Sequence, residues 1–174
     1  MIQKIDEVTR RFYGINDKEV RVGFVGGMFH ADRPLKDKDI IVCVPTLADV
    51  CNFAKELVRL GFDSVEVPGD SSYEEGENDG IWVLIRLFLG CIEYQVQVRV
   101  LDNIFDRIRE FPLSIQMKAA VVDDGVCNYW CNKDALMLEN ENICYVSTVG
   151  PYQQALEKYK EYYPNMTFLI DTAN

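Results

Sequence analysis

Two acidic residues and a pair of glycines lie close together in the segment GFVGGMFHADRPLKDKDIIV, residues 23–42. Asp37 and Asp39 are two residues apart and lead into an apolar run typical of a buried strand, so both carboxylates are expected on one side of a sheet. Two carboxylates on one face bind Mg²⁺ well, because the ion leaves its other positions to water and phosphate oxygens. Metal ions held in this way align a hydroxyl with a phosphate for phosphoryl or nucleotidyl transfer.

Gly26 and Gly27 end the strand predicted over 20–25 (VRVGFV). Backbone N–H groups at such glycines can approach a phosphate closely, which favours a phosphate-binding corner. Two structural alternatives stand beside this interpretation. The glycines are equally typical of a tight turn after a strand, and the acids are equally typical of a solvated turn whose charge Lys36 and Lys38 neutralise.

The same segment resembles the nucleotidyltransferase superfamily, with its DNA polymerase beta-like palm. The likeness is to the head domain of CCA-adding and poly(A) enzymes and to the small phage proteins related to it. Their pattern is Gly-Gly, then Arg-Asp, then Lys-Asp-x-Asp leading into an apolar strand. Gly26-Gly27 and residues 36–39 (KDKD) match in type and order, and residues 33–39 (RPLKDKD) are close to the phage form. The resemblance covers about residues 2–101 and extends more weakly into the C-terminal third.

The resemblance implies a nucleotidyltransferase palm with a mixed sheet flanked by helices. It also implies a Mg²⁺ ion bound by Asp37 and Asp39, which would be catalytic. Nucleotide-binding roles follow for the residues around them: Gly26, Gly27, Arg33 and Lys36.

The family carries a third carboxylate on a later central strand, and the candidate strand here is CIEYQVQVRVL, residues 91–101. Its alternation places Glu93, Gln95, Gln97 and Arg99 on one face. Gln95 and Gln97, which would align with the third carboxylate, are amides. They are interpreted either as substrate-binding residues or as the exposed face of a hairpin strand. Glu93 supplies a third catalytic acid if the strand is shifted by two residues. A second departure is that FHAD stands where the family has Arg-Asp.

Other polar residues have two interpretations each. Arg86 and Arg99 either grip a triphosphate or pair with surface acids. His30 and Cys43 form a nucleophile pair on paper, but a lone polar or capping histidine is the favoured interpretation. The tyrosines of the last predicted helix are interpreted as packing residues rather than a base-stacking platform: Tyr152, Tyr159, Tyr162 and Tyr163.

Composition limits the class of protein. The 174 residues predict a single domain, with a core over about 1–101 and a C-terminal hairpin and helix extension over 102–174. A net charge of −10 disfavours long nucleic acid as a partner. No apolar run reaches the roughly 20 residues of a membrane span, and the N-terminal segment lacks an apolar signal core, so a cytoplasmic protein is expected. The six cysteines lie mainly in apolar runs and are interpreted as small core residues.

Hydrophobic periodicity and turn residues predict an α/β (α+β) pattern with a mixed sheet. The expected helices cover 2–13, 46–60, 103–110 and 151–163, and the expected strands cover 20–25, 39–44, 64–67, 81–89, 91–101, 119–122, 126–130 and 167–170. Thr46, with Asp49 three residues later, predicts a capping box. Residues 68–80 are expected to form a loop.

Two functions are compatible with these residues. The first is a Mg²⁺-dependent enzyme that transfers a nucleotide from a nucleoside triphosphate to a hydroxyl of a protein or small molecule. The second is a catalytically degenerate protein of the same fold that regulates or inhibits a macromolecule. If the chain is phage-encoded, as the resemblance hints, that partner would be a host protein in the host cytoplasm.

Overall fold

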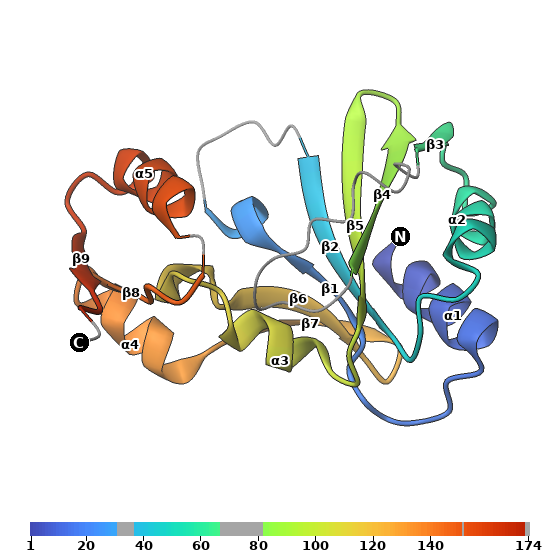
Figure 1. Cartoon of the computed structure of the whole chain (residues 1–174), viewed down its shortest axis with the longest axis horizontal. Coiled ribbons are helices and arrows are strands. Elements are labelled where there is room, and N and C mark those ends of the chain that lie inside the picture. Colours follow the sequence, from blue (N-terminus) through green and yellow to red (C-terminus); the bar gives the residue numbers. More distant parts are fainter. Residues whose placement is uncertain (31–36, 67–81, 151, 173–174) are drawn as a thin grey trace.

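The computed structural model describes residues 1–30, 37–66, 82–150 and 152–172. Within these ranges the fold is α+β, as predicted: a mixed, mostly antiparallel sheet is flanked by helices (Figure 1). The helices are α1 (Ile2–Tyr13), η1 (Gly26–Phe29), α2 (Val50–Val58), α3 (Ile104–Arg109), η3 (Ser114–Gln116), α4 (Lys133–Asn140) and α5 (Gln153–Tyr162). The strands are β1 (Val22–Val25), β2 (Asp37–Val44), β3 (Ser64–Glu66), β4 (Trp82–Leu89), β5 (Ile92–Val100), β6 (Lys118–Asp123), β7 (Val126–Cys131), β8 (Ile143–Val146) and β9 (Thr167–Ile170).

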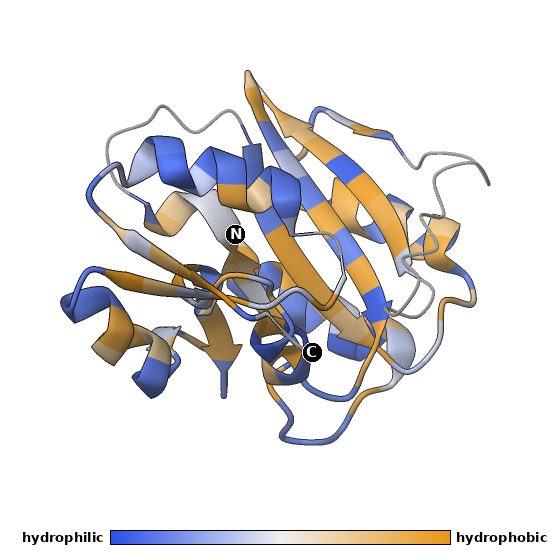
Figure 2. Ribbon diagram, turned by 60° about the vertical axis from the view of Figure 1, so that its left-hand side comes forward, coloured by the Kyte–Doolittle hydropathy of each residue, from blue (hydrophilic) through white to orange (hydrophobic). Residues whose placement is uncertain are grey.

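The main sheet has the strand order β3-β4-β5-β2-β1-β6-β7. Its one parallel pair is β2 with β5, and the other neighbours run antiparallel. Strands β8 and β9 form a separate parallel pair. Figure 2 shows hydrophobic and hydrophilic residues alternating along the long central strands, which is the pattern of a sheet with two different faces.

One face of the sheet packs on α1 and α2. Ile5 and Val8 of α1 and Phe53 of α2 lie in a cluster with Ile40 and Val42 of β2. Helix α1 ends at Gly14, whose left-handed conformation (φ 65°) suits a residue without a Cβ. Figure 1 shows both helices on the far side of the molecule from α5.

The opposite face packs on α3 near the middle of the sheet. Ile41 and Cys43 of β2 join Ile104 and Ile108 of α3 in a second cluster. Even-numbered and odd-numbered residues of β2 therefore enter different cores. The odd-numbered face also carries Asp37 and Asp39, so the local pattern fixes on which side of the sheet the acids lie.

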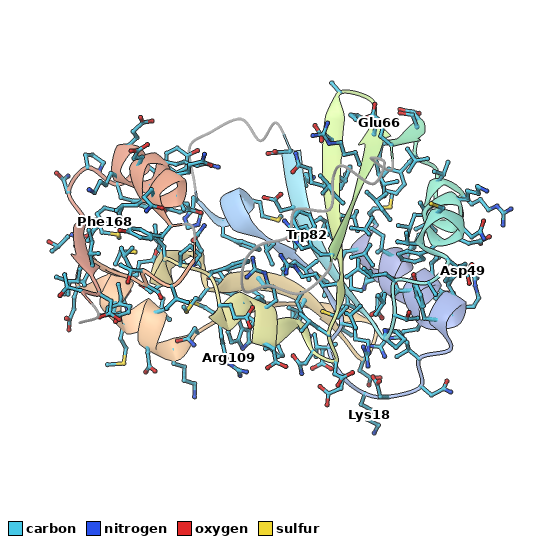
Figure 3. All side chains as sticks on the ribbon, in the orientation of Figure 1. Lys18, Asp49, Glu66, Trp82, Arg109 and Phe168 are labelled. Carbon is cyan, nitrogen blue, oxygen red and sulfur yellow. The ribbon has the colours of Figure 1, made fainter. Side chains whose placement is uncertain are left out.

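A third cluster lies in the C-terminal part of the chain, where η3 and β8 pack against α5. Its buried members are Leu113, Ile115, Cys144, Val146, Leu156 and Tyr159. The partly buried Phe168, labelled in Figure 3, packs against them at the opposite end of the molecule from Asp49. The extension predicted from residue 102 thus divides, since β6 and β7 complete the main sheet and the later elements surround this third core.

Several predicted boundaries were wrong. Strand β2 begins at Asp37 rather than at Asp39. Thr46 does not cap α2, because its Oγ1 accepts a hydrogen bond from the N–H of Ala48, and the helix begins at Val50 after Asp49 in a left-handed conformation (φ 58°). Helix α4 and strand β8 were not predicted.

Other features were predicted correctly, including the hairpin of β4 and β5 around Gly90 and the Asp124-Gly125 turn between β6 and β7. The predicted loop over 68–80 lies outside the described residues. No helix in the described part of the chain is long and apolar enough to cross a membrane.

Candidate active site

Three strand ends meet beside the two acids. Strand β1 ends where β2 begins, with Val25 paired to Asp39. On the other side of β2, the parallel strand β5 places Glu93 opposite Asp37 and Gln95 opposite Asp39. The two acids, Glu93 and Gln95 therefore lie on one face of the sheet, at the edge where β2 and β5 both start.

The glycine corner contacts the acid pair directly. Gly26 follows β1 with φ +76°, and a Cβ built on it would lie 2.7 Å from Oδ2 of Asp39. An alanine at this position would clash with that carboxylate as well as strain the backbone. At Gly27 a Cβ would meet no described atom within 4 Å, so the backbone there is open to an approaching group. Gly26 and the Asp39 carboxylate are therefore in direct contact.

Gly26→Ala tests this close contact, and Gly125→Ala is its matched control. Both glycines have nearly the same φ (+76° and +74°), but a Cβ at Gly125 would meet no described atom within 4 Å. We expect Gly125→Ala to lower the free energy of unfolding by about 1 kcal/mol through backbone strain alone. Gly26→Ala should lower the free energy of unfolding by about 1–2 kcal/mol more than Gly125→Ala does, because the Asp39 carboxylate must move. Urea unfolding measures the stability of both variants. Equal losses of stability would contradict the close contact between Gly26 and Asp39.

An amide bridges two of the acids. Gln95 Nε2 donates hydrogen bonds to Asp37 Oδ2 at 3.1 Å and to Glu93 Oε1 at 3.2 Å. Glu93 is also paired with Arg86, whose Nε lies 3.4 Å from the same oxygen. The residue beside Asp39 on the neighbouring strand is therefore the amide Gln95. Glu93 lies two residues earlier on β5 and is paired with Arg86.

The electrostatics of the site favour a bound cation. Burial, together with the negative charges of Asp37 and Glu93, raises the pKa of Asp39 to about 6, and the positive charge of Lys158 opposes the shift. Because neighbouring acids disfavour the charged form, a cation between Asp37 and Asp39 would relieve their repulsion. Two carboxylate ligands suit Mg²⁺, which usually binds one or two carboxylates together with substrate phosphates. The donor set thus fits the ion that the sequence predicts.

The described residues contain no cluster of three or more His, Cys, Asp or Glu side chains arranged to hold a metal ion. The described side chains at the acid pair therefore do not form a complete metal site by themselves. A metal at this site would take its remaining ligands from water and substrate.

Comparisons with known proteins do not assign the chain to a family. No protein-family model matches it, and no curated protein matches it either. Function must therefore be argued from the residues and their geometry.

Not all predicted site residues join the acid pair. Gln97 lies opposite Ile41, one pleat further along β5 from the acids. Arg33 and Lys36 lie outside the described residues. Lys38 points to the other face of the sheet, where its Nζ lies 5.4 Å from the ring centroid of Tyr94. Lys38 therefore does not neutralise the acids, and Lys36, the other lysine of the solvated-turn alternative, lies outside the described residues.

The remaining cations and nucleophiles also have definite positions. Arg86 pairs with Glu93, and the guanidinium of Arg99 stacks 5.2 Å from the ring centroid of Trp82, labelled in Figure 3. Cys43 is buried in the second cluster, and burial raises its pKa to about 12. A thiol with that pKa stays protonated at neutral pH, which argues against a Cys43 nucleophile.

Sequence reasoning did not identify Lys158, whose charge acts on Asp39 from α5. No local signal marks it, since it is one exposed lysine on an amphipathic helix. Its relevance comes from the contact of α5 with His30, which directly follows η1.

Proposed function

We propose that this protein is a Mg²⁺-dependent nucleotidyltransferase, which moves a nucleotide from a nucleoside triphosphate to a hydroxyl group. The observation that carries the proposal is the convergence of Asp37 and Asp39 on one sheet face, with the Gly26 backbone against Asp39 Oδ2. The resemblance of residues 23–42 to the nucleotidyltransferase superfamily supports the same assignment.

In this proposal Asp37 and Asp39 hold the ion and the glycine corner receives the phosphates. Bound Mg²⁺ would supply positive charge to the triphosphate and to the attacking hydroxyl. The carboxylates would set its position, and backbone N–H groups of Gly26 and Gly27 would donate hydrogen bonds to the phosphate oxygens. In the proposed reaction the acceptor oxygen forms a bond to the α-phosphorus, the bond from the α-phosphorus to the bridging oxygen breaks and pyrophosphate leaves, and the hydroxyl proton passes to water. Gln95 fixes the orientation of Asp37 by its hydrogen bond.

The acceptor is best sought among proteins and small molecules. A chain with net charge −10 repels the phosphates of a long nucleic acid. The acids at the site add to that repulsion unless a cation is bound.

A direct test is incubation with each α-labelled nucleoside triphosphate, Mg²⁺ and a cell lysate. We expect the label to pass to a protein or small-molecule acceptor with wild-type protein and not with Asp37→Asn/Asp39→Asn. The absence of both transfer and triphosphate binding in the wild type would contradict the proposal.

A second candidate is a catalytically degenerate member of the same fold that binds a macromolecular partner, a host protein if the chain is phage-encoded. Gln95 favours it, because an amide occupies the position beside Asp39 where the family would supply a third carboxylate. A neutral amide can bind a metal but cannot accept a proton. Capture of one partner equally by wild type and by Asp37→Ala/Asp39→Ala, with no nucleotide transfer, would favour this candidate.

Substitution of Gln95 tests whether the acid face is a cation site. Gln95→Glu replaces the hydrogen-bond donor between Asp37 and Glu93 with a further negative charge, so we expect a lower melting temperature in EDTA. Mg²⁺ should then raise the melting temperature of Gln95→Glu by more than that of the wild type, because the added carboxylate strengthens ion binding. Thermal unfolding with and without millimolar Mg²⁺ measures the difference.

The matched control is Gln97→Glu, which adds the same charge one pleat away from the acids. It should show no added response to Mg²⁺. An equal response in the two variants would mean that general charge screening, rather than an ion at Asp37 and Asp39, explains the effect.

A further inference from the structure

The C-terminal part of the chain reaches the glycine corner through His30. This residue ends η1, and its N–H donates a hydrogen bond to the Gly27 carbonyl at 3.1 Å. Its imidazole is buried, with only 7% of the residue surface exposed. The ring Nδ1 is hydrogen-bonded to the hydroxyl of Tyr163 at 2.6 Å. A side chain of the corner is thus tied to a residue 133 positions later in the chain.

Helix α5 contacts His30 at a second point. The ring of Tyr159 meets the imidazole edge-on, with centroids 4.8 Å apart and planes at 88°. Tyr159 is itself 2% exposed and belongs to the third core. Tyr159 and Tyr163 are four residues apart, so one face of the last turns of α5 is directed at the corner. The helix is therefore held both by its own core and by His30.

Lys158 precedes Tyr159 on this helix and is exposed. Its ammonium lies 5.8 Å from the ring centroid of Tyr162, a contact that leaves it accessible. Lys158 is one residue before Tyr159, whose ring meets the imidazole of His30, and its charge acts to lower the pKa of both His30 and Asp39. The other basic side chains described near the acids are engaged elsewhere, Lys38 on the opposite face and Arg86 with Glu93.

We propose that α5 is part of the nucleotide site: His30 holds the helix at the glycine corner, and Lys158 binds the phosphate chain of the triphosphate there. This inference rests on the proposed function. A triphosphate brings several negative charges to a face that already carries Asp37, Asp39 and Glu93, so a cation opposite the metal-binding acids would offset that charge. In this arrangement His30 and Tyr163 are positioning residues that act through Lys158.

The test is calorimetric titration of Mg²⁺ complexes of ATP, GTP, CTP and UTP, and of the four monophosphates, into wild type and variants. We expect Lys158→Met to weaken binding of the preferred triphosphate about tenfold, the effect of one charge-assisted hydrogen bond. Monophosphate binding should be nearly unchanged, because Lys158 contacts the phosphates beyond the first. Lys158→Arg should restore most of the affinity.

Lys160→Met is the matched control, since Lys160 is exposed on the same helix and its substitution removes the same charge. It should leave both affinities unchanged. If Lys158→Met and Lys160→Met weaken triphosphate binding equally, this inference is overturned. The proposed function still stands in that case, provided that Asp39→Asn abolishes triphosphate binding. A wild type that binds no triphosphate would overturn both.

Tyr163→Phe tests the positioning step, because it removes the hydroxyl bonded to His30 and keeps the ring. We expect a selective loss of triphosphate affinity, smaller than that of Lys158→Met. The double variant Lys158→Met/Tyr163→Phe should bind no more weakly than Lys158→Met alone, since both changes act through one ammonium. Additive losses would show that Tyr163 does not act through Lys158 and would overturn the role of His30.

Discussion

Under the proposed function, Asp39→Asn should slow nucleotidyl transfer about a thousandfold, because an amide cannot supply the charge that would hold the metal. The substitution keeps the size of the side chain and its contact with the glycine corner, where Gly26 lies against Asp39 Oδ2. Single-turnover transfer with the labelled triphosphate and its acceptor measures the effect. Binding of the Mg²⁺–triphosphate complex should fall in the same variant.

The control is Asp123→Asn, which removes an exposed acid at the end of β6 in the same sheet. Its transfer rate should equal that of the wild type. Transfer by Asp39→Asn within a factor of three of the wild-type rate would show that the chemistry lies elsewhere on the protein.

The same Asp39→Asn variant should be more stable than the wild type at pH 8, by about 2 kcal/mol. Burial, with the charge of Asp37, raises the pKa of Asp39 to about 6 from its ordinary 3.8. The folded protein therefore holds a proton that the unfolded chain has lost, and ionisation of Asp39 costs stability as the pH rises from about 4 to 6. At about 1.4 kcal/mol per pKa unit the full cost is about 3 kcal/mol, and solvent near this half-buried group reduces it.

His30 contributes the opposite pH dependence over the same range. Burial lowers its pKa to about 4, and the charges of Lys118 and Lys158 act in the same direction. The unfolded chain takes up a proton near pH 6.5 while the folded protein does not, so the stability that neutral His30 contributes is lost as the pH falls from about 6.5 to 4. Between pH 4 and 6 the contributions of Asp39 and His30 offset each other.

Removal of the Asp39 contribution should expose that of His30. We expect the free energy of unfolding of Asp39→Asn to rise with pH between 4 and 6, by roughly 1 kcal/mol per pH unit more than that of the wild type. Urea unfolding at a series of pH values gives both curves. The two curves should meet below pH 4. Curves that stay parallel up to pH 8 would show that the pKa of Asp39 is not raised in the folded protein.

The sequence predicted the parts of the site that depend on local pattern. The alternation of β2 and β5 placed Asp37 with Asp39, and Glu93 with Gln95, because side-chain direction in a strand repeats every two residues. The Gly26-Gly27 position at the end of β1 followed from the apolar run before it. These features need no knowledge of which strands pair.

The parallel register between β2 and β5 could not be predicted in this way. It decides that Gln95 rather than Glu93 lies beside Asp39, and a shift of two residues would preserve every local pattern. The contact of His30 with Tyr163 spans 133 residues, and no local signal joins them.

Helix α4 was missed because its hydrophobic pattern is weak, with Ala135 as its one fully buried residue. A usable signal was present in Asn132, whose side chain caps the helix by accepting hydrogen bonds from the N–H groups of Asp134 and Ala135.

The central claim, that a metal ion binds at Asp37 and Asp39, is tested most directly by locating the bound ion on the protein. Mn²⁺ can stand in for Mg²⁺ and broadens the NMR signals of nearby amides, so titration of the isotope-labelled protein with Mn²⁺ and triphosphate reports where the ion binds. We expect selective loss of the Gly26, Gly27, Asp39 and Gln95 amide signals, and no selective loss in Asp37→Asn/Asp39→Asn. Broadening spread over exposed acids elsewhere, with these four signals intact, would contradict it.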